Sequence, residues 1–140
     1  MRGFLLDTCA ISELRKPKPD PGFIAWISAV DETLLHISVV TLAELRIGVE
    51  MVADASKRAA IERWLQSDVT ARFGDRVLSF DLEVADRWGR MEGRARASGG
   101  RLPVIDAQIA ATAEHHDLTL VTRNEADFRR METPIVNPWR

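Results

Sequence analysis

The chain has 140 residues, a single cysteine, no long apolar run and little net charge. Because Cys9 is alone, no intramolecular disulfide can form, which fits a reducing, cytoplasmic compartment. No apolar segment is long enough to span a membrane, and Met1-Arg2-Gly3 leads into a strand-like run and not into a signal peptide. A net charge of −2 does not mark a nucleic-acid-binding protein. We therefore expect a cytoplasmic protein without membrane contact.

Several common catalytic motifs are also missing. The sequence has no glycine-rich phosphate loop, no Gly-x-Ser-x-Gly turn and no His-Glu-x-x-His pair. An aspartyl phosphotransferase would need a second acid two residues after Asp7, where Cys9 stands. The histidines have no zinc-ligand spacing. These absences disfavour nucleotide-binding, covalent-phosphate and zinc enzymes.

The order of local patterns predicts an α/β domain, because strand-like runs alternate with helical ones. An apolar fraction of 46% is ordinary for a globular protein, and we expect residues 1–140 to form one domain with a mainly parallel sheet flanked by helices. The expected strands are 3–6, 34–38, 76–80, 118–122 and a short one at Ile135-Val136. The expected helices are 8–15, 22–30, 39–53, 56–67, 82–97 and 104–116.

Two acidic residues come just after strand-like runs. Asp7 follows residues 3–6 directly, and Asp127 follows residues 118–122 across a polar turn. Open parallel sheets bind their ligands at the carboxyl ends of their strands. These positions make both residues candidates for a binding site.

Two further acids, Glu44 and Asp106, lie among apolar residues of expected helices, so we predict that both point toward the packed side. At helical spacing, Asp106 shares its face with Ile109, Ala110 and Ala113, and Glu44 shares its face with Val40, Ile47, Gly48 and Met51.

Four such carboxylates without a neighbouring Lys or Arg favour a divalent cation. A buried, unpaired carboxylate is unfavourable by several kcal/mol, or it becomes protonated. Mg²⁺ and Mn²⁺ prefer oxygen ligands, and Mg²⁺ keeps several waters while it is bound by a few carboxylates. The alternative is that the acids are structural and pair with arginines across the fold.

A basic segment follows in residues 87–101. Its arginines outnumber its single acid, Glu92, so it could form a phosphate-binding edge, or it could be an ordinary solvated helix face. The candidates for contact with RNA are Arg87, Arg90, Arg94 and Arg101.

Other polar residues have simpler interpretations. We expect Cys9 to be a small, buried apolar side chain, because no base that could activate it is identifiable. His115 and His116 end an expected helix, where a positive charge is favoured. Trp26, Trp64 and Trp88 are expected in the core, or alternatively at a surface for a partner.

Four sequence motifs together resemble the PIN-domain nucleases, nearest to VapC-type toxins of the FitB-like branch. They are Leu-Asp-Thr-x-x-Ile-Ser-Glu at 6–13, Thr-x-Ala-Glu-Leu at 41–45, Asp-Ala-x-Ile-Ala-Ala at 106–111 and Thr-Arg-Asn-x-x-Asp-Phe at 122–128. Asn137-Pro138-Trp139 is similar to the end of chains in that branch. The resemblance covers essentially the whole chain.

The resemblance implies a PIN-like fold and an endoribonuclease that depends on Mg²⁺, or on Mn²⁺ as a substitute. Its acidic positions match Asp7, Glu44, Asp106 and Asp127, of which Asp7 and Asp106 are expected to touch the ion while the other two orient water or support a second ion. Thr8, Thr122 and Asn124 are expected to support these acids by hydrogen bonds.

The chain departs from the family pattern at two positions. Cys9 stands where many relatives have Asn, which puts a supporting hydrogen bond to Asp7 in question. The last acid of the family can also occupy the position of Asn124 in place of Asp127.

The resemblance also implies partners. A cognate antitoxin would hold the toxin inactive, the chain would form a homodimer, and operator DNA would be contacted only through the antitoxin. The expected substrate is structured RNA such as tRNA. The alternative function is a catalytically weak PIN subunit that mainly supports an antitoxin–DNA complex.

Overall fold

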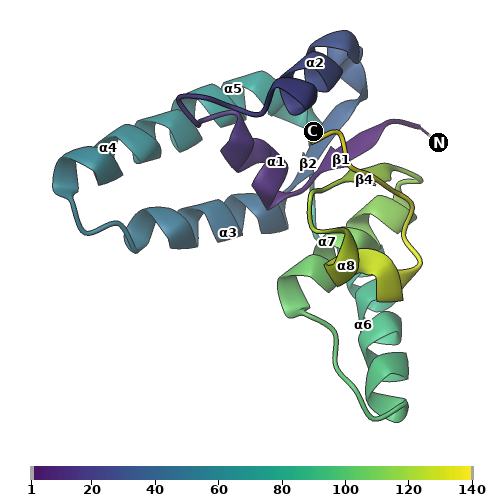
Figure 1. Cartoon of the computed structure of the whole chain (residues 1–140). Coiled ribbons are helices and arrows are strands. Elements are labelled where there is room, and N and C mark those ends of the chain that lie inside the picture. The colour runs from purple at the N-terminus through teal and green to yellow at the C-terminus, as the bar shows by residue number, and fades with distance from the viewer. Residues whose placement is uncertain (1, 140) are drawn as a thin grey trace.

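The computed structural model describes residues 2–139, and it contains a central parallel sheet of five strands with helices on both faces (Figure 1). The predicted α/β fold is confirmed. The strands lie in the order β3-β2-β1-β4-β5, and every neighbouring pair is parallel. They are β1 (Phe4–Leu6), β2 (Leu35–Ser38), β3 (Val77–Leu78), β4 (Thr119–Val121) and β5 (Ile135–Val136).

The central strand β1 determines where a ligand can bind. Leu5 pairs with His36 of β2 on one side and with Leu120 of β4 on the other. From β1 the chain first builds the sheet outward through β2 and β3, and later through β4 and β5 on the opposite side. Such a reversal opens a crevice at the carboxyl ends of the two strands, here β1 and β4.

Eight α-helices are present in the described residues, and most predicted helices are confirmed within a few residues. They are α1 (Thr8–Glu13), α2 (Pro21–Ala29), α3 (Val39–Glu50), α4 (Ala55–Arg63), α5 (Thr70–Phe73), α6 (Leu82–Ala97), α7 (Val104–His115) and α8 (Glu125–Phe128). Short 3₁₀ segments span Glu32–Leu34, Gly74–Arg76 and Arg129–Met131. No described helix is long and apolar enough to cross a membrane.

Side-chain caps explain where several helices begin. The hydroxyl of Ser38 accepts a hydrogen bond from the backbone N–H of Val40 at 3.0 Å, at the start of α3. The carboxylates of Asp20, Asp54 and Asp81 cap α2, α4 and α6 in the same way. Each cap satisfies a backbone donor that the first helical turn would otherwise leave unpaired.

Alternating strand residues build a core on each face of the sheet. Leu5 and Leu120 pack against α7, whereas Leu6 and Val121 pack against α1 and α2 on the opposite face. All four side chains are fully buried. Because neighbouring strand residues face opposite sides, these short, wholly apolar strands are those of a sheet covered on both faces.

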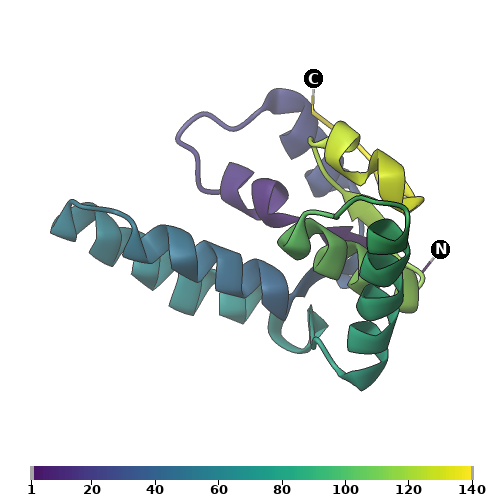
Figure 2. The same cartoon turned by 90° about the horizontal axis from the view of Figure 1, so that it is seen from below.

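The predicted single helix 56–67 was wrong in its form and extent. Helix α4 ends at Arg63, a π-helical segment occupies Trp64–Val69, and α5 continues to Phe73. The stretch from α4 to α5 lies beside α3, and together these helices project from the sheet as an arm (Figure 2). Arg46 of α3 bonds to Glu62 of α4 at 3.0 Å.

The predicted strand 76–80 was also too long. Only Val77 and Leu78 pair with β2, because the preceding residues form a 3₁₀ turn and Asp81 already caps α6.

A buried carboxylate, Glu13, ties the end of α1 to two distant segments. It accepts hydrogen bonds from the indole N–H of Trp139 at 3.0 Å, from the backbone N–H of Asp20 at 2.8 Å and from Lys16 at 2.9 Å. Burial alone would raise the pKa of Glu13, but these hydrogen bonds and the Lys16 charge lower it to about 2. The Trp139 ring also packs on Phe23, with ring centroids 4.6 Å apart.

We predict that Trp139→Phe destabilises the fold by about 1–3 kcal/mol, because Glu13 would lose a donor while it stays buried.

The folded pKa of Glu13 lies below its unfolded value of 4.5, so its stabilisation is complete above that pH and falls as the pH drops toward 2. Glu13→Gln should therefore weaken the loss of stability between pH 5 and pH 3. Urea unfolding of the three proteins at both pH values measures this, and identical pH dependence in wild type and Glu13→Gln would contradict it.

Candidate metal centre

Asp7 lies at the crevice because it directly follows β1 and caps α1. Its Oδ1 accepts a hydrogen bond from the backbone N–H of Ala10 at 2.9 Å, and its backbone N–H donates to Val121 O of β4. The side chain is 4% exposed. The cap of α1 and the backbone hydrogen bond to β4 thus hold a nearly buried carboxylate where β1 and β4 end.

Asp106 lies in the first turn of α7, and its apolar neighbours are packed as predicted. Ile109, Ala110 and Ala113 are at most 1% exposed. Asp106 itself is half-buried, at the end of a helix face that otherwise enters the core.

The prediction for the face around Glu44 was wrong. Val40 is buried, but Ile47 is 53% exposed and Met51 is 78% exposed, so the second half of this α3 face does not pack within the protein. The arm carries these residues away from the sheet, which local periodicity could not indicate. Glu44 is half-buried, where α3 leaves the body of the protein.

Asp127 is an exposed residue of the short helix α8, a helix that the sequence prediction treated as a turn. Four residues are too few for hydrophobic periodicity to reveal a helix. The side chain of Asn124, which precedes this helix, makes no cap hydrogen bond.

Electrostatics show that the four acids share one neighbourhood. Burial, followed by the charges of Asp127, Glu44 and Asp7 in that order, raises the pKa of Asp106 to about 6. Burial also raises the pKa of Asp7, opposed by hydrogen bonds and reinforced by the charge of Glu44. Among these charges, that of Asp127 contributes most to the raised pKa of Asp106.

The donor set fits a hard divalent cation that keeps part of its water shell. None of the four acids pairs with Lys or Arg among residues 2–139, in contrast with the structural alternative. In that part of the chain no three His, Cys, Asp or Glu side chains lie close enough together to hold a metal ion by themselves, so bound water would have to complete the ligand set. An open arrangement of oxygen donors suits Mg²⁺, which is bound by few carboxylates and retains waters.

Two threonine hydroxyls are also left without partners. The Oγ1 atoms of Thr8, beside Asp7, and of Thr41, one helical turn before Glu44, are buried and have no hydrogen-bond partner among the described residues. Buried polar groups normally have a partner, and ordered water is a common one. Waters around a cation would provide such partners.

Cys9 packs against the apolar core, as expected, but its thiol also makes hydrogen bonds that the sequence did not indicate. Its Sγ donates to Asp7 Oδ1 at 2.9 Å and accepts from the backbone N–H of Arg123 at 3.5 Å. Burial, followed by the charge of Asp7, raises the pKa of the Cys9 thiol to about 12, so it is protonated near neutral pH. Thr122 accepts a hydrogen bond from Asn124 N at 3.0 Å and lies 3.9 Å from Cys9 Sγ.

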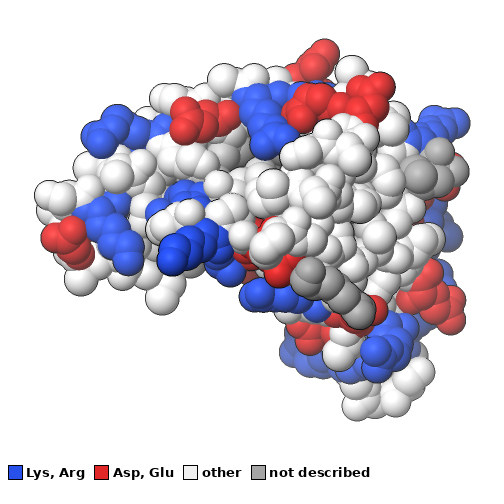
Figure 3. Space-filling view, turned by 45° about the horizontal axis from the view of Figure 1, so that its top comes forward, with Lys and Arg blue, Asp and Glu red and all other residues white. Residues whose placement is uncertain are grey.

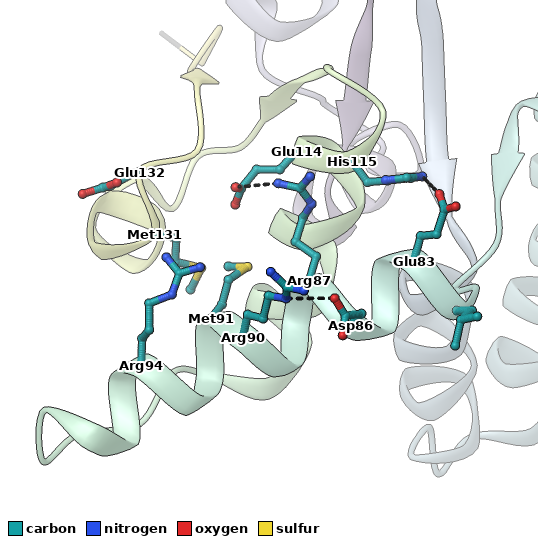
Figure 4. Close-up of a pocket in the computed structure, with 11 residues that line it drawn as sticks. Glu83, Asp86, Arg87, Arg90, Met91, Arg94, Glu114, His115, Met131 and Glu132 are labelled. Carbon is teal, nitrogen blue, oxygen red and sulfur yellow. Dashed lines mark ion pairs between the residues drawn. The ribbon is translucent and has the colours of Figure 1, made fainter.

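The arginines of α6 line a different hollow (Figure 4). A cleft of about 800 Å³ lies between α6, the end of α7 and the 3₁₀ segment Arg129–Met131. Glu114, in its wall, is eight residues beyond Asp106, about 12 Å along the helix. The cleft is therefore not the crevice that holds the acids.

Most of the four arginines that are candidates for contact with RNA already have acidic partners. Arg87 pairs with Glu114 at 3.6 Å, and Arg90 pairs with Asp86 at 2.9 Å. Arg101 lies 3.6 Å from Glu92. Only Arg94, among the four candidates, makes no ion pair with a described residue, and it extends along the cleft toward Met131 (Figure 4).

On the face in Figure 3, acidic side chains near the middle are flanked by Lys and Arg.

This arrangement of a parallel sheet with acids at its central crevice agrees with the family comparison. The PIN-domain model matches residues 4–134, and the chain belongs to the PIN-domain family. The resemblance found in the sequence motifs is thereby confirmed.

Within this family the chain is similar to toxins and ribonucleases. It is 33% identical to the toxin FitB of Neisseria gonorrhoeae, over 96% of this chain and 97% of FitB. It is 36% identical to the VapC ribonuclease Y4jK of Sinorhizobium fredii, over 96% of each chain. The crystal structure of FitAcB from N. gonorrhoeae superposes with a TM-score of 0.88 at 33% identity, covering 98% of this chain and 99% of that one.

We predict that Asp106→Asn stabilises the cation-free protein at pH 7 by on the order of 1 kcal/mol, after allowance for solvent screening. The folded pKa of Asp106 is raised, so its stabilisation is complete below about pH 3.8 and is lost as the pH rises through about 6. Wild type in EDTA should thus lose more stability than the variant between pH 4.5 and pH 7. Urea unfolding at both pH values measures this; parallel losses would show that Asp106 does not feel its neighbours.

Proposed function

We propose that this chain is a cytoplasmic, Mg²⁺- or Mn²⁺-dependent endoribonuclease and the toxin of a toxin–antitoxin pair. The observation that carries the proposal is the set of four carboxylates at the β1–β4 crevice. The charges of the other three raise the pKa of Asp106, and none of the four pairs with Lys or Arg among residues 2–139. The relatives named as toxin FitB and VapC ribonuclease support it. The proposed substrate is structured RNA such as tRNA.

In this proposal Asp7 and Asp106 hold the cation, because they are the two acids that come from the sheet crevice and from the helix packed over it. A bound Mg²⁺ or Mn²⁺ would lower the pKa of water and offset negative charge on the phosphate. Glu44 and Asp127 accept hydrogen bonds from water and orient it toward phosphorus. Thr122 supports Asp7 through a side-chain hydrogen bond, whereas the expected support from Thr8 is not made, because its hydroxyl has no partner among the described residues. Water attack leaves a 5′-phosphate and a 3′-hydroxyl.

The arginines of the basic segment 87–101 have a more limited role than the sequence suggested. Carboxylates already offset the charges of Arg87, Arg90 and Arg101, so Arg94 is the one whose charge is most available to RNA. Phosphate contacts of this kind strengthen binding without selecting a sequence.

The proposed antitoxin has an apolar groove available next to α1. A hollow of about 190 Å³ is lined by Ile11 of α1, by Leu14 directly after it and by Trp64, Val69 and Phe73 of the arm, with the charged Asp68 and Arg72 also in its wall. Because Asp7 caps the same helix, a segment bound here would lie close to the acids. A basic side chain of that segment could enter the acidic crevice and compete with the cation.

A second candidate function is a catalytically weak subunit that supports an antitoxin–DNA complex. The structure of FitAB bound to an IR36 DNA fragment favours it, since one of its chains superposes on this one with a TM-score of 0.86 at 31% identity. In this function DNA would be contacted through the antitoxin.

We also propose a homodimer through α3. Val39, Ala43, Ile47 and Met51 follow one another at four-residue spacing, and all four are exposed. An apolar stripe on an exposed helix is characteristic of an interaction surface. This stripe begins beside Glu44, so a second copy would lie near the acids.

We predict that Asp7→Asn abolishes RNA cleavage, because the carboxylate at the crevice loses its charge. Purified antitoxin-free protein and the variant are incubated with total bacterial RNA in Mg²⁺, Mn²⁺ or EDTA, and the cut ends are sequenced. The expected result is a set of discrete cuts with 5′-phosphates, lost in EDTA and reduced at least 100-fold in the variant.

The controls separate the two functions. Glu83→Gln, at the α6 cleft, should cut as wild type does. Cuts that end in 2′,3′-cyclic phosphates would contradict the mechanism. A folded, cation-binding wild type with no cuts sensitive to Asp7→Asn would favour the DNA-complex subunit.

We predict that Ile47→Glu converts the dimer to a monomer, because a charge would be buried in the apolar α3 stripe. Size-exclusion chromatography with light scattering measures the mass. Leu82→Glu is the matched control, since Leu82 is 85% exposed at the start of α6 and lies outside the stripe. A dimer that survives Ile47→Glu and dissociates with Leu82→Glu would place the interface on α6.

A further inference from the structure

The Cys9 thiol connects the ends of the two strands that form the crevice. It receives the backbone N–H of Arg123, which comes two residues after β4, and it donates to Asp7, which comes directly after β1. The direction is fixed at both ends, because a backbone N–H only donates and an ionised carboxylate only accepts. The thiol therefore accepts one hydrogen bond, from Arg123, and donates another, to Asp7.

The two donors to Asp7 act on the same oxygen. Cys9 Sγ and the backbone N–H of Ala10 both lie 2.9 Å from Oδ1. Two donors on one oxygen restrain rotation of the carboxylate about its Cβ–Cγ bond and leave Oδ2 without either of them. A hydrogen bond with the Thr122 side chain also helps to hold this carboxylate. The hydrogen bond from Ala10 belongs to the helix cap, whereas the one from Cys9 depends on a side chain.

We propose that Cys9 is a positioning residue, whose thiol orients the Asp7 carboxylate so that Oδ2 is presented to the cation. This rests on the cation site of the proposed function. Hydrogen bonds that orient a ligand side chain typically change metal affinity by 10- to 100-fold. A cysteine serves here as a neutral donor, in contrast with its usual role as a nucleophile.

Substitutions at Cys9 separate orientation from packing. Cys9→Ser keeps a donor, although the hydroxyl is smaller than the thiol. Cys9→Ala removes the donor and keeps a small apolar side chain. Ser12→Ala, also a half-buried residue of α1, is the matched control for a change in that helix.

The experiment is isothermal titration of the purified chain with Mn²⁺, together with thermal unfolding in EDTA. The expected result is that Cys9→Ala weakens Mn²⁺ binding about tenfold, while Cys9→Ser and Ser12→Ala stay within about twofold of wild type. In RNA cleavage, Cys9→Ala should approach the wild-type rate as Mn²⁺ is raised, because the lost affinity is compensated by concentration. A purely structural role would instead lower thermal stability and would not be rescued by Mn²⁺.

Each outcome has a distinct meaning. If wild type binds Mn²⁺ and Cys9→Ala binds it equally well, the positioning role is wrong and the cation site stands. If Cys9→Ser is as weak as Cys9→Ala, the donor is not what matters, which also overturns the inference. If wild type binds no Mn²⁺ in this titration, the proposed cation site itself fails, and the inference falls with it.

Discussion

The repulsion between carboxylates at the β1–β4 crevice is the constraint on which the rest of the molecule depends. Asp7, Glu44, Asp106 and Asp127 come from four different segments, and each would be more favourable farther from the others. Two cores, one on each face of the sheet, hold these segments together against that repulsion. Packing energy is thus used to maintain an electrostatically unfavourable arrangement, which is a common property of functional sites.

The four acids differ in how closely the surrounding residues are packed, and this difference suits their proposed roles. Asp7 directly follows the buried strand residues Leu5 and Leu6, and Asp106 directly precedes Ala107, which is fully buried on α7. Glu44 stands at the base of the projecting arm, and Asp127 lies exposed on a four-residue helix. The inner pair is therefore more firmly placed than the outer pair, which is closer to solvent and to any bound macromolecule.

Much of the fold could be predicted from the sequence because apolar runs and helix caps are local signals. The positions of the strands along the chain and the acid of each motif followed from that pattern together with the family resemblance. The exposed half of the α3 face could not be predicted, because Ile47 and Met51 look like core residues until the arm is seen to leave the sheet. Helix α8 was too short for its periodicity to be detected, and the polar role of Cys9 depends on Arg123, which is 114 positions away.

The C-terminal segment has a consequence for how the protein can be handled. The Trp139 ring packs on Phe23, its indole N–H bonds to Glu13, and the Arg123 guanidinium lies 5.8 Å from its centroid. Arg123 is also the residue whose backbone contacts Cys9. A purification tag or a truncation at this end of the chain would disturb Trp139, which contacts Arg123; Arg123 in turn bonds to Cys9, and Cys9 bonds to Asp7. A loss of activity in such a preparation would therefore not identify a catalytic defect.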